Sequence, residues 1–186
     1  MQADARAVLD FWFGDEPVAR AEWFRKDADF DASIRMRFGP LIDAVLAGER
    51  LGPAPADRLA ALIVLDQFTR NVFRDTPRAF AGDAAARALA LGLCERGDDL
   101  HLPPWQRAFA YLPFEHAEDL ALQERAVACF EALAEAAPEL EGMLDYARRH
   151  REVIRRFGRF PHRNAILGRS STAEELTFLH QPGSRF

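Results

Sequence analysis

The stretch Ala56-Asp-Arg-Leu-Ala-Ala-Leu-Ile-Val-Leu-Asp-Gln-Phe-Thr-Arg-Asn-Val-Phe73 decides the fold class of this chain. Its apolar residues recur every three or four positions, which is the spacing of one face of an α-helix. Pro53 and Pro55 break the chain just before it and favour a helix that begins near Ala56. The pattern predicts one helix over 56–73 with a buried apolar face.

The same helical period extends outward from this stretch in both directions, and no strand-like alternation bounded by turn residues appears. Pro40 lies inside the second predicted helix and indicates a bend or a division there. Short Pro/Gly turns between the helices predict an all-α fold of about eight helices, stacked as antiparallel hairpins in a degenerate tetratricopeptide-like array. The predicted helices cover residues 3–13, 27–48, 56–73, 82–96, 104–112, 115–136, 139–157 and 172–180.

The composition fits a globular protein. With 186 residues, of which 49% are hydrophobic, the chain is long enough to bury a sizeable core. We predict a single compact helical domain over 1–186, with a sub-boundary near 50–56 as the alternative. The net charge of −5 argues against broad affinity for nucleic acids, although segment 148–169 holds eight Arg and one Glu.

Targeting and metal signals are lacking in the sequence. Charged residues such as Asp4, Arg6 and Asp10 interrupt any apolar run that could form a signal peptide or a membrane span. Cys94 and Cys129 lack metal-ligand spacing and are expected to be reduced, mostly buried thiols. We therefore expect a cytoplasmic protein with no metal and no nucleic-acid or membrane partner. These features indicate neither a cofactor nor an oligomeric state.

Polar residues interrupt the apolar face of the helix predicted over 56–73. Asp66 and Arg70 continue the apolar stripe at i,i+4 spacing, and Gln67 and Asn71 form a second pair beside them. An i,i+4 ion pair contributes only a few tenths of a kcal/mol on an exposed helix and is costly to desolvate when buried. A self-satisfied structural pair and a binding site are therefore equal alternatives here.

Asp83 and Arg87 repeat this spacing on the next predicted helix, and Asp145 and Arg149 repeat it later. Repetition in an Arg-rich chain favours surface ion pairs, so we assign Asp145 and Arg149 a structural role. Asp83 and Arg87 stay of interest because they lie close in sequence to Asp66. Capping of its own helix is the alternative role for Asp83.

His116 is the most plausible proton-transfer residue. In a helix that begins near Glu115, His116 and Gln123 share a face that points toward the core. A lone histidine on an apolar face is more often a hydrogen-bonded core residue than a general base, and both alternatives stand. His116, Glu118 and His162 do not match the spacing of metal ligands on a helix, so we expect no metal site.

The stretch Phe157-Gly-Arg-Phe-Pro-His-Arg-Asn-Ala-Ile-Leu-Gly-Arg169 combines cationic and aromatic residues with helix-breaking ones. Gly158 and Pro161 interrupt helical geometry, which leaves backbone amides available to face a ligand. Its Arg side chains suit bidentate contacts to carboxylate or phosphate. The stretch is therefore a candidate wall of an anion pocket, and a structural network with acids of neighbouring helices is the alternative.

The segment Thr172-Ala-Glu-Glu175 matches a capping box. Thr172 occupies the N-cap position and Glu175 the third helical position. This pattern predicts a structural role only.

Four motifs together closely resemble the domain-of-unknown-function family 924. They are Leu9-Asp-Phe-Trp-Phe-Gly14, Leu65-Asp-Gln-Phe-Thr-Arg-Asn71, Leu112-Pro-Phe-Glu-His-Ala-Glu118 and Gly158-Arg-Phe-Pro-His-Arg-Asn164. The resemblance covers nearly the whole chain and implies an all-helical, tetratricopeptide-like fold without an established activity. It also suggests where a shared site would lie, at Asp66, Gln67, Arg70, Asn71, Glu115, His116, Arg159, His162, Arg163 and Asn164.

Three functional hypotheses follow from these residues. The first is a polar groove that binds a small anionic molecule or an acidic peptide end, with the anion held by Arg70, Arg159 and Arg163. In this hypothesis Asp66 and Glu115 orient the Arg groups. The second is a hydrolase in which His116 or His162 acts as general base on water. The third is a scaffold that docks other proteins along an exposed apolar groove.

Overall fold

The computed structural model describes residues 3–15 and 18–184, so both ends of the predicted unit 1–186 lie outside these ranges. Within them the chain is all-α, as predicted, with no β-strand. The helices are α1 (Ala3–Phe13), α2 (Ala28–Leu46), α3 (Pro55–Ile63), α4 (Thr69–Val72), α5 (Asp83–Glu95), α6 (Pro104–Glu115), α7 (Leu120–Ala136), α8 (Glu141–Phe157) and α9 (Ala173–Leu179). A π-helical segment, the π turn (Val64–Phe68), joins α3 to α4.

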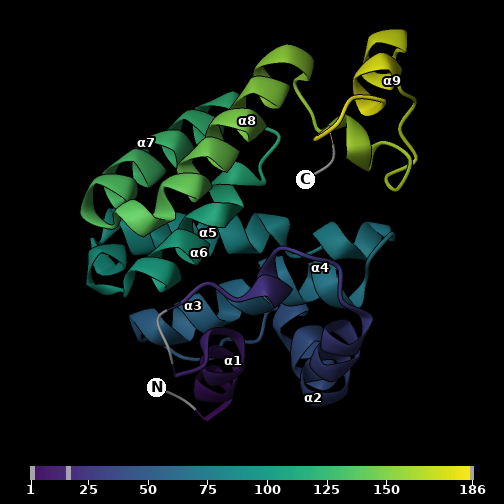
Figure 1. The fold of residues 1–186 in the computed structure, drawn as a ribbon. Helices are drawn as coiled ribbons and strands as arrows, with labels where there is room; N and C mark the ends of the chain where they lie inside the picture. Colours follow the sequence, from purple (N-terminus) through teal and green to yellow (C-terminus); the bar gives the residue numbers. More distant parts are fainter. Residues whose placement is uncertain (1–2, 16–17, 185–186) are drawn as a thin grey trace.

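From α5 to α8, consecutive helices pack side by side as antiparallel neighbours (Figure 1). α5 packs on α6, α6 on α7 and α7 on α8, which makes the C-terminal half a continuous stack. In the N-terminal half, α1 and α5 both pack against α3, while α2 packs against the π turn and α4. One apolar core runs from α1 to α8. The single-domain assignment, with its alternative boundary near 50–56, stays a prediction.

α2 runs through Pro40 without a division. Proline removes one backbone hydrogen bond, but buried Phe38 and Ile42 anchor the helix on either side of it. The apolar stripe therefore outweighs the proline, so the division is wrong, while the alternative of a bend stays a prediction.

The π turn is the main departure from the regular helix predicted over 56–73. The backbone amide of Thr69 donates to the carbonyl of Val64, five residues back. The Thr69 hydroxyl donates to the Leu65 carbonyl at 2.8 Å, and its side chain is fully buried. A π turn shifts the helical register of the residues within it, and such turns are frequent at functional sites. Asp66 and Gln67 lie inside this one.

The turn between α6 and α7 also differs from the prediction. α6 extends to Glu115, so Glu115 ends a helix where the sequence pattern indicated the start of one. His116 follows in the turn and does not share a helical face with Gln123. Instead, the Gln123 amide on α7 donates to the carbonyls of Glu115 at 2.5 Å and Ala117 at 2.8 Å. These bonds hold the end of α6 and fix the position of His116.

The C-terminal segment leaves α8 as the sequence predicts. Gly158 ends the helix with a φ of +69°, a conformation that favours glycine, and Pro161 opens a short 3₁₀ turn. Fully buried Phe160 packs with Val153 and Ile154 of α8 in a second, smaller apolar cluster. This contact brings residues 160–164 back toward the main core.

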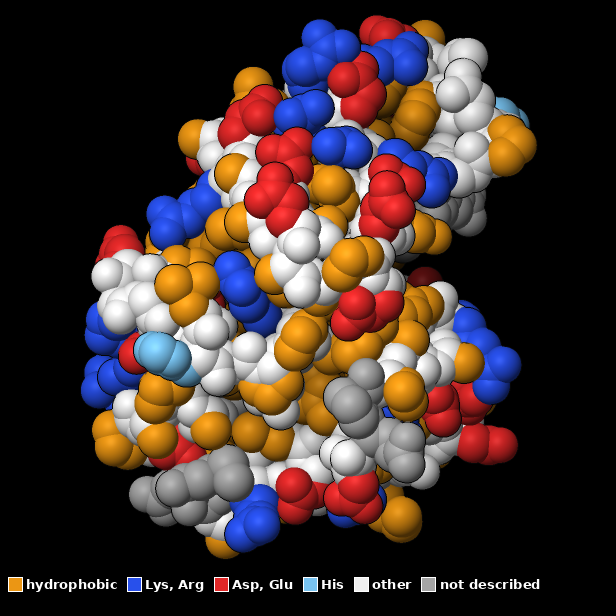
Figure 2. All heavy atoms as spheres, turned by 60° about the vertical axis from the view of Figure 1, so that its left-hand side comes forward, with side chains coloured by type: hydrophobic (Ala, Val, Ile, Leu, Met, Phe, Trp, Pro, Cys, Tyr) orange, Lys and Arg blue, Asp and Glu red, His pale blue; other side chains and the backbone are white. Residues whose placement is uncertain are grey.

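The surface of this part of the chain is a mixture of opposite charges (Figure 2). Arg155 pairs with Glu152 and Arg156 with Glu174, so much of the local Arg excess is neutralised by ion pairs. Of the helices described, none is both long enough and apolar enough to cross a membrane. Cys94 and Cys129 are free and half-buried.

Candidate functional site

Asp66 lies at the centre of a buried polar cluster that the π turn creates. Its carboxylate is 1% exposed, yet it has three polar neighbours. The Gln67 amide donates to Oδ2 at 2.6 Å, and Nη1 of Arg70 lies 3.1 Å from Oδ1. Burial acts to raise the pKa of Asp66, but Arg70 and His116 outweigh it and hold the pKa well below its usual range. Asp66 therefore stays ionised inside the protein.

His116 is the third neighbour of Asp66. Its Nδ1 lies 2.8 Å from Asp66 Oδ1, although the two residues are 50 positions apart. An ionised carboxylate only accepts, so this contact places the ring proton on Nδ1 and leaves Nε2 with its lone pair. Burial lowers the pKa of His116, and the charge of Asp66 only partly opposes this. The imidazole is therefore neutral at neutral pH.

Asp83 completes the acidic side of the cluster. It accepts from Arg70 Nη1 at 2.9 Å and from Nη2 at 3.2 Å, a bidentate ion pair between α4 and α5. Asp83 therefore pairs with Arg70 of another helix and not with Arg87 of its own helix. The N-cap of α5 is Gly82 and not Asp83. Arg70 also donates to the Asp66 carbonyl at 2.7 Å. Nη1 and Nη2 of Arg70 therefore both donate to protein acceptors.

Gly82 makes this approach of α5 to the π turn feasible. A Cβ atom at Gly82 would lie 2.2 Å from the Leu65 carbonyl oxygen, which is far inside van der Waals contact. Only glycine therefore lets the first residue of α5 reach the π turn this closely. The sequence pattern did not single out Gly82.

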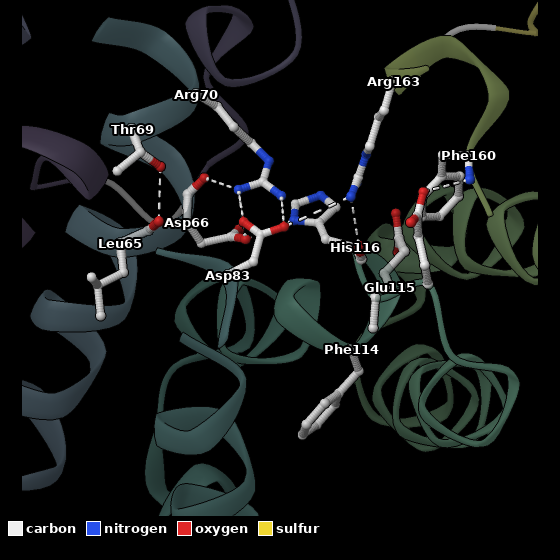
Figure 3. Close-up of polar contacts among 12 residues, drawn as sticks. Leu65, Asp66, Thr69, Arg70, Asp83, Phe114, Glu115, His116, Phe160 and Arg163 are labelled. Atoms are coloured by element: carbon white, nitrogen blue, oxygen red, sulfur yellow. Dashed lines mark hydrogen bonds and ion pairs between the residues drawn. The ribbon is translucent and has the colours of Figure 1, made fainter. Parts of the chain in front are cut away.

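Arg163 approaches the same cluster from the C-terminal segment (Figure 3). Its Nη1 donates to the His116 carbonyl at 3.0 Å and lies 3.7 Å from Asp83 Oδ2. The guanidinium lies 4.8 Å from the ring centroid of Phe80 and 4.4 Å from that of Phe160. Burial and the nearby Arg70 lower the pKa of Arg163 to about 10. Its Nε is buried without a hydrogen-bond partner.

A cleft of about 400 Å³ opens beside these groups. We call it the His116 cleft, and its walls include Phe80, Asp83, Arg87, His116, Leu122 and Arg163. In the described structure no hydrogen bond or ion pair involves Arg87. The cleft therefore combines a neutral histidine with two cations that have spare donors and with apolar side chains.

Glu115 lies behind His116, on the core side. Its Oε1 is 3.1 Å from Nδ1 of His150, and the His150 ring centroid is 6.3 Å from that of His116. Glu115 Oε2 is buried without a hydrogen-bond partner. Burial, with a smaller contribution from Asp66, raises the pKa of Glu115 to about 8. Glu115 is thus neutral at pH 7 and orients no Arg side chain.

A second polar cluster, the Glu175 network, takes up other residues of the C-terminal motif. Arg159 donates to Glu175 through Nε at 2.6 Å and Nη2 at 2.8 Å, and Asn164 Nδ2 donates at 3.3 Å. Thr172 closes the predicted capping box with its amide 2.7 Å from Glu175 Oε2. These contacts lower the pKa of Glu175 to about 2, mainly through Arg159. Arg159 and Asn164 therefore hold the C-terminal segment in place and do not line the His116 cleft.

The remaining candidate residues lie elsewhere. Asn71 donates to Asp31 of α2 at 2.7 Å and is therefore not paired with Gln67. His162, whose ring centroid is 5.6 Å from that of Phe160, is not part of the cleft wall. The amide of Phe160 donates to Glu118 at 2.8 Å, so this backbone group is not available to a ligand, contrary to expectation.

His150 and Phe80 belong to the cluster, although the sequence motifs did not include them. His150 shares a helical stripe with the buried residues Met143, Ala147 and Ile154 of α8. A histidine inside such a stripe was a signal that could have identified it. Phe80 had no comparable signal, because its role comes from tertiary contacts with the guanidinium groups of Arg70 and Arg163.

A larger cleft of about 490 Å³ lies at the other end of the α7–α8 hairpin. Its walls include Glu131, Glu135, Glu141 and Arg148. Arg148 pairs there with Glu131 at 3.1 Å, and both side chains are about half exposed. With no buried polar group among these residues, this cleft is the weaker candidate.

The chain belongs to the family described as "Bacterial protein of unknown function (DUF924)", whose model matches residues 8–183. Its structure is similar to that of a protein of unknown function from Agrobacterium tumefaciens, with a TM-score of 0.80 and 38% sequence identity. The similarity covers 95% of this chain and 96% of the other. No protein of curated function matches the chain. The family and the fold agree with the resemblance of the four motifs.

Proposed function

We propose that the protein binds a small carboxylate-bearing molecule, or the carboxylate end of a peptide, in the His116 cleft. The observation that supports this most directly is Arg163. A guanidinium has five N–H donors, and Arg163 makes one hydrogen bond with the described residues, to the His116 carbonyl. Its side chain is 8% exposed and borders the cleft. A bound carboxylate would accept from its remaining donors and offset the cost of burying the charge.

The balance of charges around the cleft favours a monoanion. Its described wall carries two cations, Arg87 and Arg163, and three anions, Asp83, Glu118 and Asp119, of which Asp83 pairs with Arg70 and Glu118 with Arg169 outside the wall. Asp119 caps α7 and is partly compensated by the positive end of that helix. A single carboxylate therefore meets a slightly positive site, whereas a phosphate dianion would leave an excess of negative charge.

The lining predicts the rest of the ligand. Phe80, Leu122 and Leu167 supply apolar surface between the charged groups. This mixture suits a carboxylate attached to a short apolar or aromatic body. It does not suit the docking scaffold, which requires a predominantly apolar groove.

Isothermal titration calorimetry with 4-hydroxybenzoate, acetate and inorganic phosphate tests the proposal. We expect 4-hydroxybenzoate to bind more tightly than acetate, and phosphate to bind least. Arg163→Lys keeps the charge but loses the planar donors, so the affinity should fall by about tenfold. Arg87→Gln should lower it by a smaller factor.

Arg151→Gln is the matched control, because Arg151 pairs with Glu124 away from the cleft. Its affinity for 4-hydroxybenzoate should equal that of the wild type. Binding that is unchanged in both Arg163→Lys and Arg87→Gln would contradict the proposal, as would the absence of any binding at millimolar concentration.

A further inference from the structure

We propose that the His116 cleft hydrolyses an ester or amide of its carboxylate-bearing ligand, with His116 as general base and Asp66 as the positioning residue that orients it. The inference rests on the anion binding proposed above and adds an activity to it. It derives from the arrangement of the Asp66–His116 pair relative to the cleft.

The pair has the geometry of an oriented general base. Asp66 is buried and ionised, and it holds His116 through Nδ1 at 2.8 Å. Nε2 of His116 makes no hydrogen bond within the described structure, and 16% of the side chain is exposed, in the wall of the cleft. In catalytic triads, a buried carboxylate fixes the tautomer and the direction of the imidazole in the same way.

The surroundings keep the pair rigid. Gln67 and Arg70 occupy the other acceptor sites of Asp66, and the backbone of His116 is held by Leu112 at 2.8 Å and by Arg163 at 3.0 Å. A fully buried structural histidine would need protein partners for both ring nitrogens. His116 directs one to Asp66 and presents the other to the cleft.

Water must be the nucleophile in this site. Among the described side chains that line the cleft, none is Ser, Thr or Cys, so a covalent intermediate has no obvious acceptor. Direct attack by water on a carbonyl needs only a general base and positive charge near the developing oxyanion. His116 supplies the first, and Arg87 and Arg163 supply the second.

The reaction balances without a further reactant. Nε2 of His116 takes a proton from water while the water oxygen forms a bond to the carbonyl carbon, and the C=O π electrons move to the oxygen. When the tetrahedral intermediate collapses, the bond to the leaving alcohol or amine breaks, and the imidazolium returns its proton to that group. One water is consumed, and a carboxylic acid and an alcohol or amine are released.

Hydrolysis of 4-acetoxybenzoate tests the activity directly, with its neutral methyl ester and the amide 4-acetamidobenzoate as companion probes. We expect the wild type to accelerate hydrolysis of 4-acetoxybenzoate by at least about 100-fold over buffer, with the methyl ester slower. His116→Gln should reduce the rate to that of buffer, and Asp66→Asn should lower it by about tenfold, which leaves a measurable rate. His101→Gln, on a surface turn, should have no effect.

The pH dependence of the hydrolysis rate distinguishes a role of Asp66 in positioning His116 from a role in stabilising the fold. The wild-type rate should rise with pH through the lowered pKa of His116 and then level off, because only the neutral imidazole accepts a proton. Asp66→Asn should move this midpoint to lower pH, since the charge of Asp66 raises the His116 pKa. A mere loss of folded protein would scale the profile without moving it.

Modification by diethyl pyrocarbonate gives a readout that needs no substrate. The reagent acylates neutral, accessible imidazoles, so peptide mapping should find His116 modified and 4-hydroxybenzoate should protect it. A His116 that stays unmodified while His101 reacts would overturn the inference.

The two proposals fail in different ways. Absence of hydrolysis of both 4-acetoxybenzoate and 4-acetamidobenzoate by a wild type that binds 4-hydroxybenzoate would overturn the activity and leave the binding function intact. Hydrolysis retained by His116→Gln would also overturn the activity. Unchanged binding in the Arg163 and Arg87 variants would overturn the binding function itself.

Discussion

The His116 cleft and the Glu175 network are built from the same residue types with opposite results. In the Glu175 network, Arg159 satisfies the acid bidentately, and Thr172 and Asn164 take its remaining acceptor sites. In the His116 cleft, Arg163 has one hydrogen bond and His116 presents Nε2 to solvent. A network that satisfies its own groups holds the fold, whereas one that leaves donors spare can hold a ligand.

One buried carboxyl group near each region also titrates in the opposite direction to the other. Arg159 lowers the pKa of Glu175 to about 2, whereas burial raises the pKa of Glu115 to about 8. The first carboxyl stabilises the fold when it is ionised, and the second does so when it is protonated. The type of residue alone therefore does not set the pKa of a carboxyl group; burial and neighbouring charges set it.

Gly82→Ala should have the largest effect, because it pushes α5 away from the π turn and so disrupts the His116 cleft. The new Cβ would clash with backbone atoms of Leu65, so we expect a loss of about 3 kcal/mol in the free energy of unfolding. Urea denaturation measures it. Gly142→Ala in α8, where the Cβ meets nothing within 4 Å, is the control and should be neutral or slightly stabilising. Equal stability of the two variants would disprove the close approach.

Glu175→Gln weakens the second region, the Glu175 network. Loss of the charge weakens both Arg159 bonds, and the cost should be about 2 kcal/mol. Hydrogen exchange should rise in residues 158–183 and stay unchanged in the π turn. Glu174→Gln is the control, since among the described residues Glu174 pairs only with Arg156 and both side chains are exposed. Faster exchange in the π turn as well would show that the two clusters are one unit.

Glu115→Gln tests how the free energy of unfolding depends on pH. The folded-state pKa of Glu115 is about 8 and its ordinary value is 4.5, so the native state holds an extra proton between these values. Wild-type stability should therefore decline as the pH rises from 4.5 to 8, because the unfolded chain releases this proton over that range and the folded protein does not. The variant should lose this decline.

Thermal unfolding of wild type and Glu115→Gln across this pH range gives the answer. The contribution of Glu175 to the free energy of unfolding depends on pH in the opposite direction. It is present above pH 4.5 and is lost as the pH falls toward 2. Parallel pH profiles for wild type and Glu115→Gln would mean that Glu115 is ionised in the fold.

Arg87→Gln should have the smallest effect on stability, within about 0.5 kcal/mol, because no described residue pairs with Arg87. The same change should nevertheless weaken binding of 4-hydroxybenzoate. A stability loss well above this range in urea denaturation would assign Arg87 to the fold, and it would then no longer count as a spare cation of the cleft.

Much of the fold could be predicted from local pattern. The 3.6-residue period gave the helices, and glycine and proline gave most of their ends, as at Gly14 and Gly158. The pattern failed at Glu115, where Gln123 from α7 holds the end of α6. It also missed the π turn, because nothing in the residues of 64–68 distinguishes a wide turn from a regular one.

The candidate site was predicted in part. The motifs around Asp66, His116 and Arg163 do converge, but Arg159 and Asn164 of the same C-terminal motif turn toward Glu175. Neighbours in sequence separate here because residues 160–164 form a turn, and a turn directs successive side chains to different sides.

The sequence by itself determined an all-α chain, most of its helix ends and the residues that make it a member of its family, since these follow from short-range periodicity and turn chemistry. Only the tertiary structure decided which Arg meets which acid. Partners in the tertiary ion pairs lie far apart in the sequence, by 16 positions for Arg159 with Glu175 and by 51 for Arg169 with Glu118, and helix packing sets their distances. Burial, which depends on the same packing, then fixed which carboxyl is ionised and which is neutral.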